Sequence, residues 1–155
     1  EPAQLEPAQL ETAQLESAQF NSYLLLDTHV WLWLVSGKIE NLSEASQQAI
    51  DAAERIGISA MSVWEVGMLE AKGRIQLRKN CLDWVREALS APKVALIPLT
   101  PEIAIESSRL PGIIHGDPSD RILAATTRLE GASLVTKDRQ LQLYGQQSFL
   151  SVIRA

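Results

Sequence analysis

Cysteine is nearly absent from this sequence: among 155 residues, only Cys81 occurs. A single thiol excludes a disulfide framework within the chain and a metal site built from several thiolates. No apolar run approaches the roughly 18 residues that span a bilayer, so no membrane segment is predicted. The first residues are acidic and lack the basic and then apolar pattern of a secretory signal. We therefore expect a cytoplasmic protein that does not associate with membranes.

The formal charge of −5 is unevenly distributed along the chain. Residues 1–21 contain the pentapeptides EPAQL, EPAQL, ETAQL and ESAQF, with four glutamates and no basic residue. This spacing places the apolar residues on neither one helical face nor one strand face. We predict a low-complexity tail over residues 1–21 and one domain over residues 22–155. The domain keeps 15 of the 19 acidic residues and all 14 basic ones, so its charge does not exclude a nucleic-acid partner.

Strand and helix signals alternate along the domain. The apolar runs that predict strands lie at 22–27, 56–61, 94–99, 133–138 and 149–153. The segments that predict helices lie at 29–35, 43–55, 63–72, 81–90, 102–109 and 118–130. Alternating units with short connections are typical of a parallel sheet covered by helices on both faces. The expected fold is a three-layer α/β/α sandwich.

Four acidic residues follow strands or open helices in this pattern. Asp27 ends SYLLLD, Asp138 ends SLVTKD, Glu65 follows IGISAM, and Asp120 opens the helix after HGDPSD. Ligands of open parallel sheets bind outside the carboxyl ends of the strands, so we expect these side chains to converge. Clustered carboxylates repel each other unless cations lie among them, and Mg²⁺ or Mn²⁺ suits an all-oxygen site. Such a site predicts hydrolysis of phosphodiesters.

Each acid also has an alternative structural role. SVWE, which starts at Ser62, has the form of a capping box in which Glu65 reaches back to the helix start. Asp117 followed by Pro118 has the form of another helix start. Asp120 has the position of a partner for the helix dipole, and Asp138 that of a helix cap. Asp27 has the position of a turn residue at the end of its strand. Capping does not explain why all of these acids fall at one edge of the predicted sheet.

Three segments carry a family resemblance. LLLDTHVWLW, SVWEVG and DPSDRILAATTRLEGASLVTKD resemble successive motifs of PIN-domain ribonucleases, close to the VapC-type toxins of bacterial toxin–antitoxin pairs. The resemblance covers residues 22–153 and implies an α/β/α fold that cleaves RNA with Mg²⁺ or Mn²⁺. It assigns the four successive acidic positions of the family to Asp27, Glu65, Asp120 and Asp138.

The roles within this site are predicted as follows. Asp27, Asp120 and Asp138 are expected to hold the metal, while Glu65 either completes the shell or orients the attacking water. The resemblance further implies an antitoxin partner that blocks the site, and a homodimer. Three basic residues adjoin the acids and are expected to contact RNA phosphates without reading the sequence: Arg121, Lys137 and Arg139.

Other functions compete with the ribonuclease. A signalling receiver domain requires paired acids after its first strand, where this chain has only Asp27, and neither SAMS nor IPLT contains an aspartate. A non-catalytic binding module would use the acids as caps alone and would bind no Mn²⁺. A P-loop enzyme is excluded because no glycine-rich loop with Lys-Ser or Lys-Thr occurs.

Overall fold

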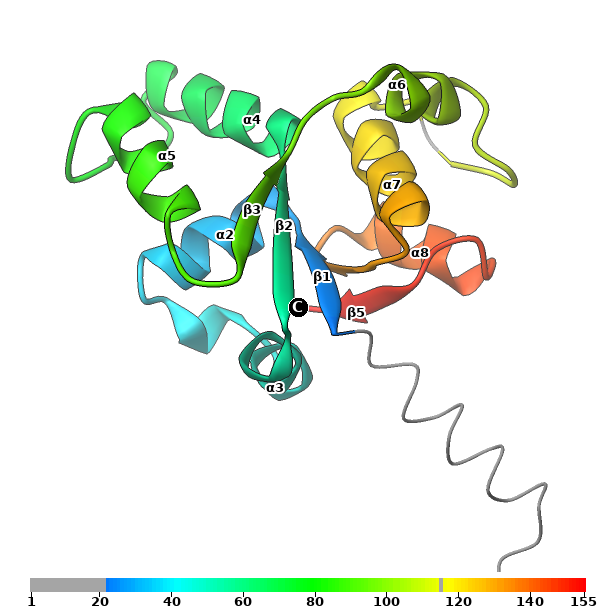
Figure 1. Ribbon diagram of the computed structural model, residues 1–155, viewed down its shortest axis with the longest axis horizontal. Coiled ribbons are helices and arrows are strands. Elements are labelled where there is room, and N and C mark those ends of the chain that lie inside the picture. The colour runs from blue at the N-terminus through cyan, green and yellow to red at the C-terminus, as the bar shows by residue number, and fades with distance from the viewer. Residues whose placement is uncertain (1–21, 115) are drawn as a thin grey trace, which may run out of the picture.

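The computed structural model describes residues 22–114 and 116–155, so the predicted tail at 1–21 lies outside the described residues. Within them, five strands form one sheet in the order β3-β2-β1-β4-β5 (Figure 1). The strands are β1 (Tyr23–Leu26), β2 (Arg55–Ser59), β3 (Val94–Ile97), β4 (Ser133–Thr136) and β5 (Val152–Arg154). Every neighbouring pair is parallel, which confirms the predicted sheet.

Helices connect the strands, mostly near the predicted positions. They are α2 (Thr28–Val35), the 3-10 helix η1 (Ile39–Asn41), α3 (Glu44–Ala52), α4 (Ala60–Ala71), α5 (Cys81–Leu89), α6 (Pro101–Ser108), α7 (Pro118–Glu130) and α8 (Arg139–Gln146). The predicted strand at 56–61 was too long. It ends at Ser59, whose hydroxyl accepts a hydrogen bond from the Met61 amide at 3.1 Å and caps α4. The last strand begins at Val152 rather than at residue 149, because α8 and a turn precede it.

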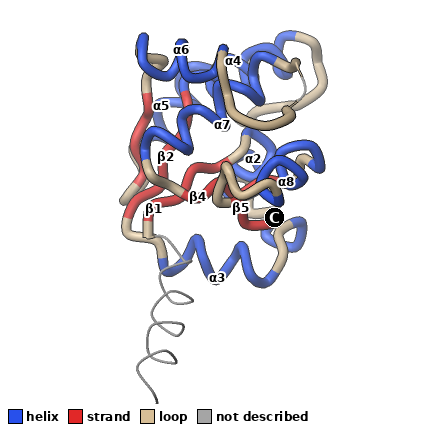
Figure 2. The backbone as a smooth tube through the Cα atoms, turned by 90° about the vertical axis from the view of Figure 1, so that its right-hand side faces the viewer, coloured by secondary structure: helices blue, strands red, loops and turns tan. Residues whose placement is uncertain are grey.

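Two apolar cores lie on opposite faces of the sheet, since side chains alternate along a strand. Leu24 and Leu26 pack with buried residues of α2, α3, α4 and α5. Leu25 packs on the other face with buried residues of α6, α7 and α8. Figures 1 and 2 show these helices on both sides of the strands, which confirms the α/β/α sandwich. No helix in the described part of the chain has the length and apolar character needed to cross a membrane.

Gly57 allows the central strands to pack closely. It pairs with Leu25 of β1 and with Ala95 of β3 in the register of the sheet. A Cβ atom at this position would lie 2.4 Å from Ile97 Cδ1 and 2.8 Å from Leu25 Cδ1. Both contacts are shorter than van der Waals distance, so any larger residue would displace core side chains on the face covered by α6, α7 and α8.

We expect Gly57→Ala to lower the free energy of unfolding by about 1–3 kcal/mol, because it overpacks this core. Gly67→Ala is the matched control, since Gly67 lies within α4 and a Cβ atom there would meet nothing within 4 Å. That control should raise the free energy by up to about 1 kcal/mol through helix propensity. Urea unfolding measures both. A shift of the same sign in the two variants would contradict this account of the packing.

Candidate active site

Asp27 and Asp138 lie at one edge of the sheet because β1 and β4 are parallel neighbours. Asp27 directly follows β1, and its amide donates a hydrogen bond to the Val135 carbonyl of β4 at 3.0 Å. Asp138 follows β4 by two residues. The carboxyl ends of the two strands therefore bring together acids that are 111 positions apart in the sequence.

Thr136, the last residue of β4, connects these two acids. Its hydroxyl donates to Asp27 Oδ2 at 2.5 Å and accepts from the Asp138 amide at 3.0 Å. The Thr136 side chain is fully buried, so this hydroxyl has a fixed orientation. Asp138 also accepts from the Leu141 amide at 2.9 Å, which confirms its predicted role as the cap of α8. One of its carboxylate oxygens therefore orients the helix, and the cap fixes the side chain at the edge.

Glu65 lies within α4, more than one turn after the first residue of the helix. The predicted capping box at Ser62 is wrong, because Ser59 caps the helix and Ser62 is buried inside it. The Ser62 hydroxyl instead accepts a hydrogen bond from the Thr28 hydroxyl at 3.0 Å. The Glu65 carboxylate accepts a hydrogen bond from the Ser119 hydroxyl, in the first turn of α7. Glu65 therefore faces the start of α7, where Asp120 also lies.

Asp117 and Asp120 open α7 in different ways. The Asp117 carboxylate accepts from the Ser119 amide at 2.9 Å and from the Asp120 amide at 3.3 Å, which confirms it as the helix cap. Pro118 occupies the first helical position, where a missing amide hydrogen costs nothing. Asp120 lies in the first turn, where the helix dipole favours a negative charge.

Electrostatics indicates that the four acids act on one another. Burial raises the pKa values of Asp27 and Glu65 above their ordinary range, and each is coupled to at least one other acid of the edge. The pKa of Asp120 rises to about 7, first through burial and then through repulsion by the other acids. Those acids are, in decreasing order of effect, Asp138, Asp117, Asp27 and Glu65. The structure thus brings the other three predicted site residues within electrostatic reach of Asp120.

The acidic side chains of this edge are of the chemical type that binds hard divalent cations. As the side chains lie, no group of three or more His, Cys, Asp or Glu residues in the described part of the chain is arranged to hold a metal ion. Every candidate donor is nevertheless a carboxylate oxygen, and burial and repulsion disfavour the charged forms of Asp27, Glu65 and Asp120. A divalent cation would offset that repulsion, and carboxylates are the ligands that Mg²⁺ and Mn²⁺ prefer.

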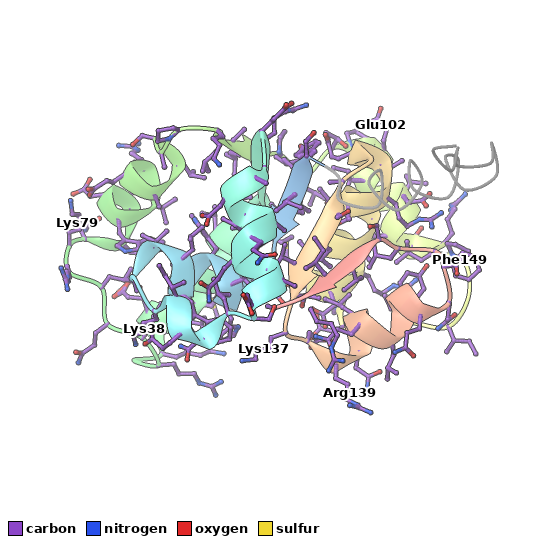
Figure 3. All side chains as sticks on the ribbon, turned by 90° about the horizontal axis from the view of Figure 1, so that it is seen from below. Lys38, Lys79, Glu102, Lys137, Arg139 and Phe149 are labelled. Atoms are coloured by element: carbon purple, nitrogen blue, oxygen red, sulfur yellow. The ribbon has the colours of Figure 1, made fainter. Side chains whose placement is uncertain are left out.

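The three predicted phosphate-binding residues differ in their surroundings. Arg121 Nε donates to the Ser107 carbonyl at 2.9 Å, so this guanidinium joins α7 to the end of α6. Lys137 Nζ donates to the Asn41 carbonyl at 3.1 Å and lies 5.0 Å from the ring centroid of Trp33. Arg139 is exposed, and Figure 3 shows it and Lys137 at the same edge of the molecule. Of the three, Arg139 is the one whose side chain forms no hydrogen bond or ion pair with another described residue.

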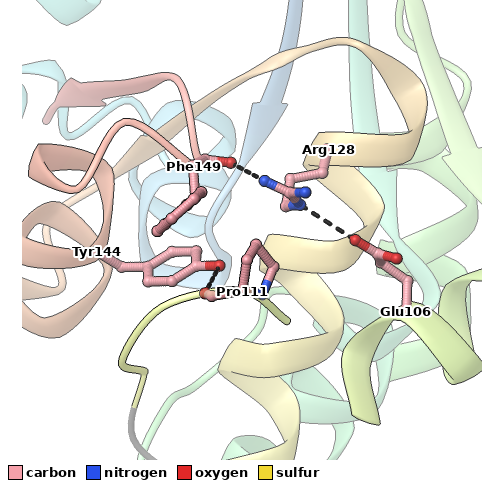
Figure 4. A network of polar contacts seen from close by, with 5 residues as sticks. All are labelled: Glu106, Pro111, Arg128, Tyr144 and Phe149. Atoms are coloured by element: carbon pink, nitrogen blue, oxygen red, sulfur yellow. Dashed lines mark hydrogen bonds and ion pairs between the residues drawn. The ribbon is translucent and has the colours of Figure 1, made fainter. Parts of the chain in front are cut away.

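Residues of α8 and its C-cap hold the loop that leads to Asp117 and Asp120, a role that sequence reasoning missed. Tyr144 Oη donates to the Pro111 carbonyl at 2.6 Å (Figure 4). The Gln147 side-chain amide donates to the Ile113 carbonyl at 2.8 Å and accepts from the Ile113 amide at 3.0 Å. These partners are 33 and 34 positions apart, and neither contact leaves a local sequence signal.

Comparisons with known proteins show which family and fold this chain resembles. The model of the PIN domain family matches residues 24–146. The chain is 39% identical over 119 residues to Ribonuclease VapC22 of Mycobacterium tuberculosis, which is 77% of this chain and 89% of that protein. The fold of the present chain is similar to the folds of solved structures, including the following two.

The first is VapBC2 from Rickettsia felis bound to a DNA fragment from their promoter, with a TM-score of 0.60 and 15% identity. The matched region comprises 97% of that chain and 84% of the present one. The second is a toxin-antitoxin complex from Klebsiella pneumoniae, with a TM-score of 0.56 and 22% identity. It is covered over 96% of its chain and again 84% of this one. At these identities the two structures show the fold alone.

The raised pKa of Asp120 predicts a pH dependence of stability in the metal-free protein. Between about pH 4 and 7, folded Asp120 retains a proton that the unfolded chain has released, so stability falls as the pH rises through this window. We expect Asp120→Asn to remove much of this fall and to stabilise the protein by about 1–2 kcal/mol at pH 8, after a discount for solvent screening. Denaturant unfolding in EDTA at a series of pH values measures the effect.

Asp51→Asn is the control, because it makes the same change of charge at an exposed position of α3. It should retain the pH dependence of the parent protein. If Asp120→Asn and Asp51→Asn gave the same difference from the parent at pH 5 and pH 8, the electrostatic account of the acidic edge would be wrong.

Proposed function

Because this chain belongs to the PIN domain family, we propose that it is a metal-dependent endoribonuclease and the toxin of a toxin–antitoxin pair. The observation that carries the proposal is the set of four mutually coupled carboxylates at the carboxyl edge of the sheet. Ribonuclease VapC22, which matches 77% of the chain, supports RNA as the substrate. The two similar solved structures, which are described as a VapBC assembly and a toxin-antitoxin complex, support an antitoxin partner.

In this proposal Asp27, Asp120 and Asp138 hold Mg²⁺ or Mn²⁺. A bound ion of this kind supplies an activated water and stabilises the charge that develops on the scissile phosphate. Thr136 supports the ligand set, because its buried hydroxyl holds the half-buried Asp27 carboxylate in one orientation. Glu65, held by Ser119, either completes the ligand set or orients the attacking water.

The remaining parts of the proposal rest on the family. We propose a homodimer, a cytoplasmic location and an antitoxin that blocks the acidic edge. The pentapeptide segment at 1–21 is proposed to lie outside the nuclease domain of residues 22–155 and to be dispensable for catalysis.

We expect Asp27→Asn and Asp120→Asn each to reduce RNA cleavage by roughly a hundredfold or more, because each removes a charge that holds the cation and positions the reacting groups. Cleavage by the parent protein should require Mg²⁺ or Mn²⁺ and stop in EDTA. A fluorescence-quenched single-stranded RNA of mixed sequence gives the rate.

Asp117→Asn is the matched control in the same loop. Asparagine caps a helix nearly as well as aspartate does, so α7 should start unchanged and cleavage should stay within a few-fold of the parent. Full activity of Asp27→Asn in a preparation free of other nucleases would exclude the proposed site.

A further inference from the structure

A polar cleft of about 420 Å³ lies between α8 and β5. Four long polar side chains line it: Arg139, Gln142, Gln146 and Arg154. No aspartate or glutamate of the described residues contributes to its walls. The cleft is therefore cationic, although the whole chain has a net charge of −5.

Gly145 allows the two walls of this cleft to meet at its base. A Cβ atom at Gly145 would lie 2.7 Å from Val152 Cγ2, so α8 packs against β5 at a distance that only glycine permits. Both residues line the cleft.

The cleft adjoins the acidic edge through Thr136. Arg154 is the register partner of Thr136, and paired residues of parallel strands project to the same face of the sheet. Gln142 Nε2 donates to the Thr136 carbonyl at 3.0 Å, while the Thr136 hydroxyl donates to Asp27. Arg139 follows Asp138 directly in the sequence. Two residues of the edge are thus next to an arginine of the cleft: Thr136 lies beside Arg154 in the sheet, and Asp138 precedes Arg139 in the sequence.

The two arginines of the cleft differ from other basic residues of the protein. Arg128 pairs with Glu106, and Lys79 pairs with Glu87. Arg139 and Arg154 are exposed, and neither guanidinium forms an ion pair with any residue among 22–114 and 116–155. Their charges are thus available to a ligand from solution.

We propose that this cleft binds a backbone phosphate of the RNA strand adjacent to the scissile one. The proposal rests on the proposed ribonuclease function and names a phosphate subsite for it. A guanidinium binds phosphate through two parallel hydrogen bonds, and two guanidiniums across one cleft can bind both non-bridging oxygens of a phosphodiester. The exposed amide of Gln146 adds a neutral donor for ribose or phosphate oxygen. Continuity with the acidic edge favours RNA over an acidic protein segment.

The test uses the full chain carrying Asp27→Asn, so that bound RNA is not cleaved. Fluorescence anisotropy of a labelled single-stranded RNA of random sequence gives Kd over a series of salt concentrations. We expect Arg139→Gln with Arg154→Gln to weaken binding about tenfold or more at low salt. The slope of log K against log salt should fall in magnitude by about 0.7 for each lost phosphate contact.

Arg55→Gln with Arg86→Gln is the matched control. It removes the same two charges, but Arg55 begins β2 and Arg86 lies in the last turn of α5, just before β3 starts. Arg55 is therefore at the amino end of its strand, and α5 covers the face of the sheet opposite to α8. This pair should keep the salt slope of the parent, and unchanged thermal midpoints will show that both double variants are folded.

The outcomes separate this proposal from the function on which it rests. Equal salt slopes for the two double variants, with cleavage by the protein that retains Asp27, would overturn the phosphate subsite alone. A reduced slope confined to Arg139→Gln with Arg154→Gln, without cleavage by the parent, would support the subsite and overturn the proposed catalysis. Loss of affinity for a polyglutamate peptide, with an unchanged RNA slope, would assign the cleft to an acidic protein and overturn the proposal.

Discussion

The parallel pairing of β1 with β4 is the constraint on which the site depends. Both strands are buried on both faces, so apolar burial alone tolerates more than one register. The polar residues at the strand ends restrict it. In the observed register Leu26 pairs with Val135, and the half-buried Asp27 carboxylate accepts a hydrogen bond from the Thr136 hydroxyl. A shift by one residue would separate this half-buried carboxylate from its donor, which removes a charge-assisted hydrogen bond.

The same pairing concentrates negative charge where the fold tolerates it least. The carboxyl ends of β1 and β4 and the starts of α4 and α7 place four acids in a partly buried edge, and the pKa of Asp120 rises to about 7 as a result. Three of the four acids are nevertheless held by a specific contact: Asp27 by Thr136, Glu65 by Ser119, and Asp138 by its cap of α8. The side chains of these three acids are therefore ordered in the metal-free protein, and binding of a cation would require them to shift rather than to order.

The sequence predicted the order of the strands and of most helices, though not α8 as an element, because apolar patterns and helix starts are local. Alternating apolar runs predict the layers, and Asp117 with Pro118 predicts the start of α7. Glu65 was harder, because Ser59 and Ser62 both suit a cap, and only the end of β2 at Ser59 decides between them. Contacts between distant segments were not predictable: Ser119 with Glu65, and Tyr144 with Pro111, join elements whose approach is set by packing of whole helices.

The net charge of this chain does not predict its partners, because several basic side chains already bind groups of the protein itself. Arg128 and Lys79 are paired with glutamates, while Arg121 and Lys137 donate to main-chain carbonyls. Among the basic groups that remain, Arg139 and Arg154 line a cleft that adjoins the acids through Thr136 and Asp138. An RNA strand at the acidic edge would otherwise encounter only repulsion. Neutralisation by a cation at the acids and by arginines next to them solves the same electrostatic problem on two adjacent phosphates.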